Sequence, residues 1–185
     1  IDLTGKAVEQ TVNKIGIGFC FAPVFHSSMK HAVTARKELG VPTVFNVLVP
    51  LANPAKPVAA AIGVARPESL PLMAQVLLDQ GKEGFVFRGD DGLDEVSLST
   101  TTTIIQINKG KLSKEVFDPT ELGIAGAAIS DIAGGDAKYN ASITNQIFAG
   151  KTGPMRDAVT LNAAFAIAAF KGDFDLPLST QIANG

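Results

Sequence analysis

The sequence predicts an α/β fold, with a mixed, mainly parallel sheet flanked by helices and part of a helical domain on the N-terminal side. From residue 58 onward, short apolar or β-branched runs alternate with longer helical patterns, an order typical of α/β proteins. Residues 1–56 carry mainly helical patterns. The 185 residues are 46% hydrophobic, with a mean hydropathy of +0.23, which is enough to form a core. We therefore expect a helical part over residues 1–56 and an α/β domain over residues 57–185.

Composition and charge exclude several classes of protein. Sixteen basic and eighteen acidic residues give a net charge of −2 without a basic stripe, so we expect no nucleic-acid partner. No apolar run approaches the ~18 residues that cross a membrane. The single cysteine, Cys20, excludes an intrachain disulfide and fits a reducing compartment such as the cytoplasm. The start, Ile1–Thr4, has neither a signal-peptide pattern nor an initiating methionine, so we expect that it lies within a longer chain.

The N-terminal part is predicted to form three helices, each with a capping or breaking residue. Thr4 can cap the first, Ser27 or Ser28 can cap the second, and Gly40 can end it. The apolar run 15–21 fits either a strand or a buried loop, because periodicity does not distinguish them over so short a segment. It is broken at Ala22-Pro23. The expected helices span residues 4–13, 27–40 and 43–48, the last ending before Pro50.

The second part is predicted to alternate strands with helices. The segment 100–107 is β-branched, and the turn at 108–111 favours a hairpin with the run that follows it. The last helix is apolar on most sides, which indicates burial. The expected strands span residues 58–64, 85–87, 100–107 and 112–117, and the helices span residues 67–79, 136–148 and 154–170.

Arg36 is the first candidate for a binding role. It follows Met29, Ala32 and Val33 at helical spacing, so it falls on the apolar stripe of its helix. A buried cation needs an anion. The pattern leaves three interpretations open. Arg36 forms an internal ion pair, or its aliphatic part packs on apolar residues while the guanidinium reaches solvent. The third interpretation is that the guanidinium binds a carboxylate or phosphate ligand through two hydrogen bonds. His26, ten residues earlier, is either a surface or capping residue or shares a site with Arg36.

Four carboxylates within six residues form the second candidate. Asp90, Asp91, Asp94 and Glu95 directly follow an apolar strand, and ligands of α/β sheets bind at the carboxyl ends of strands. Clustered carboxylates repel one another less when a hard cation binds. The spacing is not that of an EF-hand, whereas the adjacent pair Asp94-Glu95 suits Mg²⁺. The alternative is an acidic surface turn. The chain has no phosphate-binding Walker loop, GxSxG elbow, HExxH or CxxC motif.

Six segments, taken in order, resemble the anthranilate phosphoribosyltransferases, a family of glycosyl transferase family 3. No single segment is as specific as their order, and together they cover nearly the whole chain. The segments are residues 16–40 with their Ala-Pro, His and Arg positions, 42–46 (PTVFN), 50–55 (PLANPA), 89–95 (GDDGLDE), 153–159 (GPMRDAV) and 161–164 (LNAA).

The resemblance implies transfer of phosphoribose from phosphoribosyl pyrophosphate to the amine of anthranilate, in tryptophan biosynthesis. It also implies a homodimer with a helical domain, of which residues 1–56 would be a remnant carrying the acceptor-site helices. By matching position, Arg36 would grip the carboxylate of anthranilate, and Pro23, His26 and Met29 would contact the same substrate. Asp94 and Glu95 would hold Mg²⁺ near the pyrophosphate.

Two departures from the family pattern stand out. Val49 occupies a position where the family has glycine, so it would crowd the acceptor site or disfavour a glycine-only backbone angle. The family's glycine-rich phosphate loop and two further donor-binding segments lie before the point where this sequence starts. The resemblance therefore predicts the middle-to-late part of an enzyme, inactive alone.

Two alternatives stay open. One is a relative that acts on another acceptor, such as a nucleoside phosphorylase or a transferase for a different aromatic amine. The other is a non-catalytic α/β module that associates through uncovered apolar residues, expected at Val8, Val12, Phe19 and Phe25.

Overall fold

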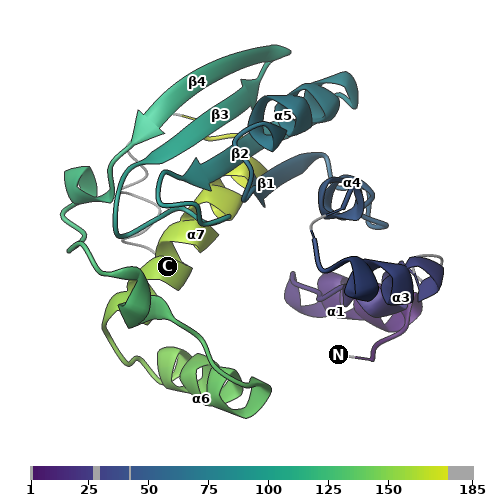
Figure 1. The fold of residues 1–185 in the computed structure, drawn as a ribbon, viewed down its shortest axis with the longest axis horizontal. Coiled ribbons are helices and arrows are strands. Elements are labelled where there is room, and N and C mark those ends of the chain that lie inside the picture. The colour runs from purple at the N-terminus through teal and green to yellow at the C-terminus, as the bar shows by residue number, and fades with distance from the viewer. Residues whose placement is uncertain (1, 27–29, 42, 175–185) are drawn as a thin grey trace. The chain divides into compact units, whose positions relative to one another are not determined.

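The computed structural model describes residues 2–26, 30–41 and 43–174, and the chain divides into two compact units, Ile1–Lys56 and Pro57–Gly185. Each unit is described by itself (Figure 1). The first contains the helices α1 (Gly5–Ile15), α2 (Ala22–Phe25), α3 (Lys30–Leu39) and α4 (Phe45–Leu51). The second contains β1 (Ala59–Gly63), α5 (Ser69–Asp79), β2 (Glu83–Gly89), β3 (Thr102–Asn108), β4 (Lys111–Phe117), the 3₁₀ helices η2 (Pro119–Leu122) and η3 (Ile129–Ile132), α6 (Ala137–Phe148) and α7 (Pro154–Lys171).

The predicted ends of the first helices are largely confirmed. Thr4 caps α1 by accepting a hydrogen bond from the backbone N–H of Ala7. The helix continues beyond the expected end at residue 13 to Ile15, where Gly16 ends it in a left-handed conformation. Gly40 follows α3 with a φ of 62°. The predicted cap at Ser27 or Ser28 lies outside the described residues.

Three details of the first unit differ from the prediction. The segment after α1 is an exposed loop, with Ile17 70% accessible, because only its Gly18 lies close against α1, beside Val8 and Val12. Pro23 lies in the first turn of α2 rather than breaking the chain there, since a first-turn residue needs no backbone N–H. The fourth helix continues through Pro50 to Leu51. Of the apolar residues expected to be uncovered, Val8 is buried and Phe25 is half-buried, whereas Val12 and Phe19 are exposed.

The second unit is built on a mixed four-stranded sheet with the order β1-β2-β3-β4 (Figure 1). The prediction of a mixed sheet flanked by helices is confirmed, but the prediction that most of its strands pair in parallel was wrong. Within the described residues only β1 and β2 pair in parallel, through the crossover helix α5. The two-residue turn Lys109-Gly110, with positive φ at both positions, makes β3 and β4 an antiparallel hairpin. The loop from β2 to β3 contains no crossover helix, and these strands are antiparallel as well.

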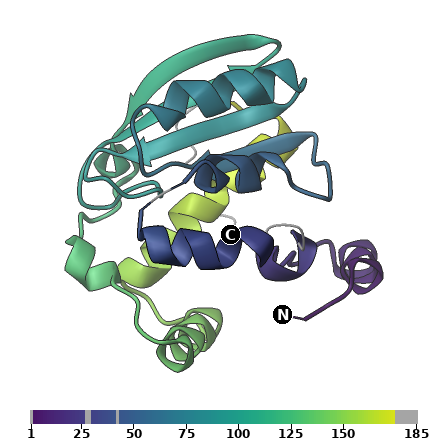
Figure 2. The same cartoon turned by 45° about the vertical axis from the view of Figure 1, so that its right-hand side comes forward.

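Two helices cover opposite faces of this sheet (Figures 1 and 2). On one face, the buried ring of Phe165 from α7 lies 5.3 Å from that of Phe85 and 5.5 Å from that of Phe117, measured between centroids, in edge-to-face geometry. On the other face, α5 contributes the buried side chains of Met73 and Leu77. β1 is half-buried rather than buried, and one side of α7 is exposed, with Phe170 84% accessible, so the prediction of burial on most sides was too strong. Among the helices of the described ranges, none is long and apolar enough to span a bilayer.

Candidate functional site

The acidic segment forms a closed loop at the carboxyl end of β2. The backbone N–H of Gly89 donates to Leu93 O over 2.9 Å, and that of Gly92 donates to Gly89 O over the same distance. The backbone N–H of Asp90 donates to Thr101 O, which joins the two ends of the loop. The loop therefore has a defined conformation, as a site for a ligand would need.

Asp90 and Asp91 are occupied by hydroxyl donors. Asp90 accepts hydrogen bonds from Thr101 and Thr103. Asp91 Oδ2 accepts from Ser97 Oγ at 2.5 Å and from Ser99 Oγ, while its Oδ1 accepts from the backbone N–H of Leu93. Partial burial opposes the ionisation of Asp91, but these hydrogen bonds together outweigh it and hold the pKa of the carboxyl below its usual value. Both side chains thus hold the loop in its conformation.

Asp94 and Glu95 differ from them. Both residues are exposed, and neither side chain hydrogen-bonds or pairs with a cation within the part of the chain that the structure describes. Glu95 lines the cavity described below. Partial burial of the carboxyl, followed in importance by the negative charge of Asp94, raises the pKa of Glu95. The loop therefore presents two adjacent, unpartnered carboxylates.

The end of β1 packs directly against this pair. An ideal Cβ on Gly63 would lie only 1.6 Å from the carbonyl oxygen of Asp94. Only a residue without a side chain allows the loop to approach β1 so closely. This glycine could not be identified from the sequence, because no local pattern links it to a loop that follows so much later in the chain.

Asn162 on α7 holds the loop from its other side. Its Oδ1 accepts the backbone N–H of Val96 at 2.8 Å, and its Nδ2 donates to the carbonyls of Val96 and Ala158. The side-chain amide of Asn162 thus hydrogen-bonds both backbone groups of Val96, as the backbone of a neighbouring strand would. The two residues are 66 positions apart in the sequence.

Replacing Asn162 with alanine is expected to lower the free energy of unfolding by about 1–3 kcal/mol, since the backbone groups of Val96 lose their partner. Urea denaturation of the two proteins measures the difference. The matched control is Asn140→Ala, because the side chain of Asn140 hydrogen-bonds to the exposed backbone of Gly135 and should matter less. Equal losses for the two variants would contradict the role given to Asn162.

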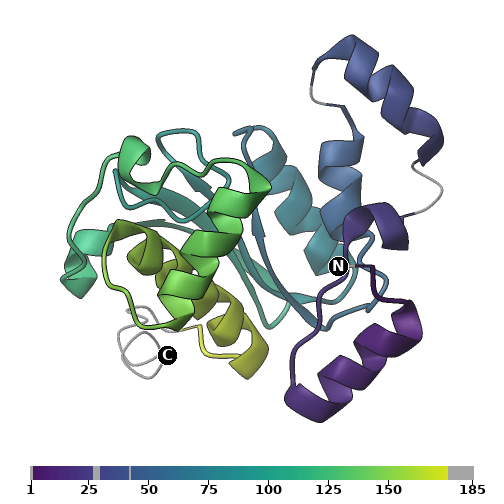
Figure 3. The same ribbon diagram turned by 90° about the horizontal axis from the view of Figure 1, so that it is seen from below.

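A cavity of about 450 Å³ lies beside Glu95 and Val96, and residues of α6 and α7 supply most of its lining. Figure 3 shows the course of these two helices. Most of its lining is apolar, including Ile143, Ile147 and Met155. The amide of Asn162 at its wall is already engaged, as described above. The side chains of Asn140 and Thr144, which also line the cavity, hydrogen-bond to backbone groups as well.

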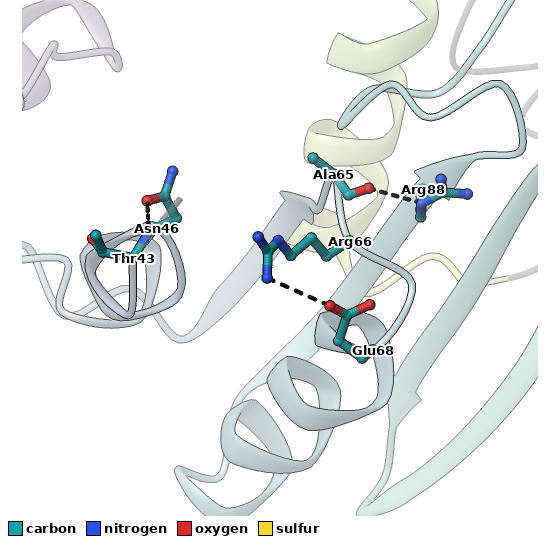
Figure 4. A network of polar contacts seen from close by, with 6 residues as sticks. All are labelled: Thr43, Asn46, Ala65, Arg66, Glu68 and Arg88. Carbon is teal, nitrogen blue, oxygen red and sulfur yellow. Dashed lines mark hydrogen bonds and ion pairs between the residues drawn. The ribbon is translucent and has the colours of Figure 1, made fainter. Parts of the chain in front are cut away.

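A second arrangement joins the carboxyl ends of β1 and β2 (Figure 4). Arg88 Nε donates to Ala65 O at 3.0 Å, and its Nη1 donates to Gly89 O at 3.1 Å. Arg66 pairs with Glu68 at 3.7 Å, but both side chains are exposed, so this ion pair contributes little to stability. Arg88 thus reinforces the strand ends from which the acidic loop starts.

The other candidates belong to the first unit. Pro23 is exposed in α2, and the half-buried His26 ends that helix with its backbone N–H donating to Ala22 O. Arg36 lies within α3, but its side chain is outside what the structure describes, and Met29 lies outside the described residues altogether. Their binding roles therefore stay predictions.

Two further positions of the first unit concern the motifs around α4. The backbone N–H of Thr43 donates to Asn46 Oδ1 at 3.1 Å, at the start of the helix (Figure 4). Val49 lies within α4, half-buried, and is not among the residues with positive φ. The expected conflict with a glycine-only backbone angle is therefore absent, and crowding of an acceptor is the consequence that stays open.

The donor set at Asp94 and Glu95 fits Mg²⁺. No group of three or more His, Cys, Asp or Glu side chains gathers for a metal in the described ranges. Mg²⁺ does not need one, because it usually keeps several waters and takes one or two carboxylates together with phosphate oxygens of a substrate. Two free, adjacent carboxylates on a fixed loop meet that requirement.

Comparison with known proteins agrees with the resemblance. The family described as "Glycosyl transferase family, a/b domain" matches residues 1–183. The anthranilate phosphoribosyltransferase of Rhodococcus jostii is 48% identical over 185 residues, which are 100% of this chain and 51% of that protein. The corresponding protein of Rhodococcus opacus is 50% identical with the same coverage. The chain thus spans about half the length of the curated relatives it matches.

Solved structures agree with the sequence relatives. An anthranilate phosphoribosyltransferase from Thermus thermophilus matches with a TM-score of 0.83 and 36% identity, over 95% of this chain and 52% of that one. The enzyme from Saccharomyces cerevisiae in complex with PRPP and Mg matches with a TM-score of 0.86 and 30% identity, over 98% of this chain and 52% of that one.

Proposed function

Since the chain belongs to the glycosyl transferase family, we propose that it forms part of an enzyme that transfers phosphoribose from phosphoribosyl pyrophosphate to the amine of anthranilate. The curated relatives named above carry that activity in their names. The observation within this chain that best supports the proposal is the free carboxylate pair Asp94-Glu95 at the carboxyl end of β2, with the neighbouring aspartates occupied by hydroxyls.

In this proposal Asp94 and Glu95 hold Mg²⁺, by similarity to the yeast enzyme that was solved in complex with PRPP and Mg. The metal, when bound, neutralises the charge that develops on the departing pyrophosphate. The fixed loop keeps the two carboxylates in place for this task.

Arg36 binds the carboxylate of anthranilate in the same proposal, with Pro23, His26 and Met29 lining the acceptor site. A guanidinium can grip a carboxylate through two parallel hydrogen bonds, which orients the amine without protonating it. The amine then attacks the anomeric carbon as pyrophosphate leaves, so the reaction needs orientation rather than a protein nucleophile. We further propose a cytoplasmic homodimer that works in tryptophan biosynthesis.

The choice of acceptor tests this proposal. The assay uses the reconstituted enzyme, which we define as this chain co-expressed with the part of the Rhodococcus jostii protein that it does not match. We expect consumption of anthranilate with phosphoribosyl pyrophosphate and Mg²⁺. Aniline, which lacks the carboxylate, should react at least tenfold more slowly, because a charged hydrogen bond contributes about 1.5–3 kcal/mol.

The alternative of another acceptor predicts a different result. Equal rates for aniline and anthranilate, or cleavage of a nucleoside by phosphate in place of either reaction, would assign the chain to a relative with another substrate. The measurement is the disappearance of each acceptor, followed by chromatography.

A further inference from the structure

The two occupied aspartates of the acidic loop are bonded in different ways. Asp90 takes its hydroxyl donors from Thr101 and Thr103, at and just before the start of β3. Asp91 takes its donors from Ser97 and Ser99, which follow the carboxylate pair in sequence. The bonds of Asp91 therefore close the short segment 91–99 around Asp94 and Glu95. Those of Asp90 span the wider segment 90–103, which the backbone bond from the N–H of Asp90 to Thr101 O already closes.

Of the two serines that donate to Asp91, Ser97 lies in the core of the second unit. Ser97 is fully buried, and its backbone N–H donates to Oγ1 of the fully buried Thr102 at 3.0 Å. The Oγ of Ser97 also accepts the backbone N–H of Ser99 at 2.9 Å. Ser97 is therefore held by β3, and the exposed Ser99 is tied to Ser97.

We propose that Asp91 is a positioning residue for the carboxylate pair: through Ser97 and Ser99 it closes residues 91–99 into the one conformation in which Asp94 and Glu95 stand together and free for a divalent cation. Two adjacent carboxylates repel each other, so an open loop would separate them. Holding them together in advance lowers the conformational cost of binding. Residues that orient metal ligands typically change metal affinity by about 10- to 100-fold when they are replaced.

The proposal rests on the Mg²⁺ site of the proposed function, and it is tested on the 185-residue chain itself. Mg²⁺ is added to ¹⁵N-labelled protein, and the amide shifts of residues 92–96 give the dissociation constant. We expect Asp91→Ala to raise that constant at least tenfold. Asp91→Asn should lie between, since an amide keeps one acceptor oxygen and loses the other.

Three variants separate positioning from general stability. Asp90→Asn is the matched control, because it also loses acceptor capacity for two hydroxyls but keeps the backbone bond to Thr101 and every bond of Asp91. It should keep the wild-type Mg²⁺ affinity, while its melting temperature should be similar to that of Asp91→Asn. Ser99→Ala should weaken Mg²⁺ binding, and Ser99→Thr should restore it, since Ser99 is exposed and threonine keeps the hydroxyl.

The outcomes test two claims separately: the Mg²⁺ site at Asp94 and Glu95, and the positioning role of Asp91. Asp94→Asn must abolish the Mg²⁺-dependent shifts if the site is correctly assigned. If Asp91→Ala binds Mg²⁺ like the wild type while Asp94→Asn does not, the positioning role is wrong and the site stands. If the wild type and Asp94→Asn respond alike, whether both bind or neither does, the site itself is wrong, and the role of Asp91 falls with it.

Discussion

Alanine at position 63 is expected to lower the free energy of unfolding by about 3 kcal/mol and to weaken Mg²⁺ binding at least tenfold. Its methyl group would lie 1.6 Å from the carbonyl oxygen of Asp94, well inside the distance at which two atoms overlap. A backbone carbonyl cannot rotate away as a side chain can, so β1 or the acidic loop has to move. Urea denaturation gives the stability, and an Mg²⁺ titration of the same samples gives the affinity.

Gly126→Ala provides the matched control for Gly63→Ala. At Gly126 the nearest atom to an added Cβ is Leu98 O at 3.5 Å, an ordinary contact, and no positive φ is required. This variant should stay within about 0.5 kcal/mol of the wild type and keep its Mg²⁺ affinity. If Gly63→Ala is as stable and binds Mg²⁺ as tightly as Gly126→Ala, the close packing of the loop on β1 has no role.

Replacing Arg36 with alanine in the reconstituted enzyme is expected to raise the KM for anthranilate by about 10- to 100-fold, from the loss of about 1.5–3 kcal/mol of charged hydrogen bonding. The KM for phosphoribosyl pyrophosphate should change little, because the proposal assigns Arg36 to the acceptor alone. Initial rates at varied concentrations of each substrate separate the two constants.

Arg36→Lys and Lys37→Ala sharpen that experiment. Lysine keeps the charge but not the planar fork, so Arg36→Lys should fall between wild type and Arg36→Ala. Lys37→Ala removes a charge from the next position of α3 and should leave both constants unchanged. An unchanged KM for anthranilate in Arg36→Ala would support a different acceptor.

The sequence was sufficient to predict features whose causes are local. Thr4 caps α1 within its own turn, and the Lys109-Gly110 turn dictates the β3–β4 hairpin. The pair Asp94-Glu95 could be singled out because both carboxylates stand next to each other after an apolar strand. Whether they are the metal ligands stays a prediction.

Features with distant partners could not be predicted in this way. Asn162 binds the backbone of Val96 from 66 residues away, and nothing near either residue indicates the contact. No sequence pattern indicates that the hydroxyls of Ser97 and Ser99 donate to Asp91, because the contact depends on the fold of the loop. The share of parallel strands was overestimated because alternation of strands and helices indicates the class of a fold but not the direction of each strand.

The most direct test of the central claim is the loss of anthranilate fluorescence in the presence of phosphoribosyl pyrophosphate and Mg²⁺, measured for this chain alone and for the reconstituted enzyme. We predict negligible turnover by the chain alone, turnover by the reconstituted enzyme, and loss of that turnover in Asp94→Asn. Turnover by the chain alone at the rate of the reconstituted enzyme would contradict the account, as would full activity of Asp94→Asn.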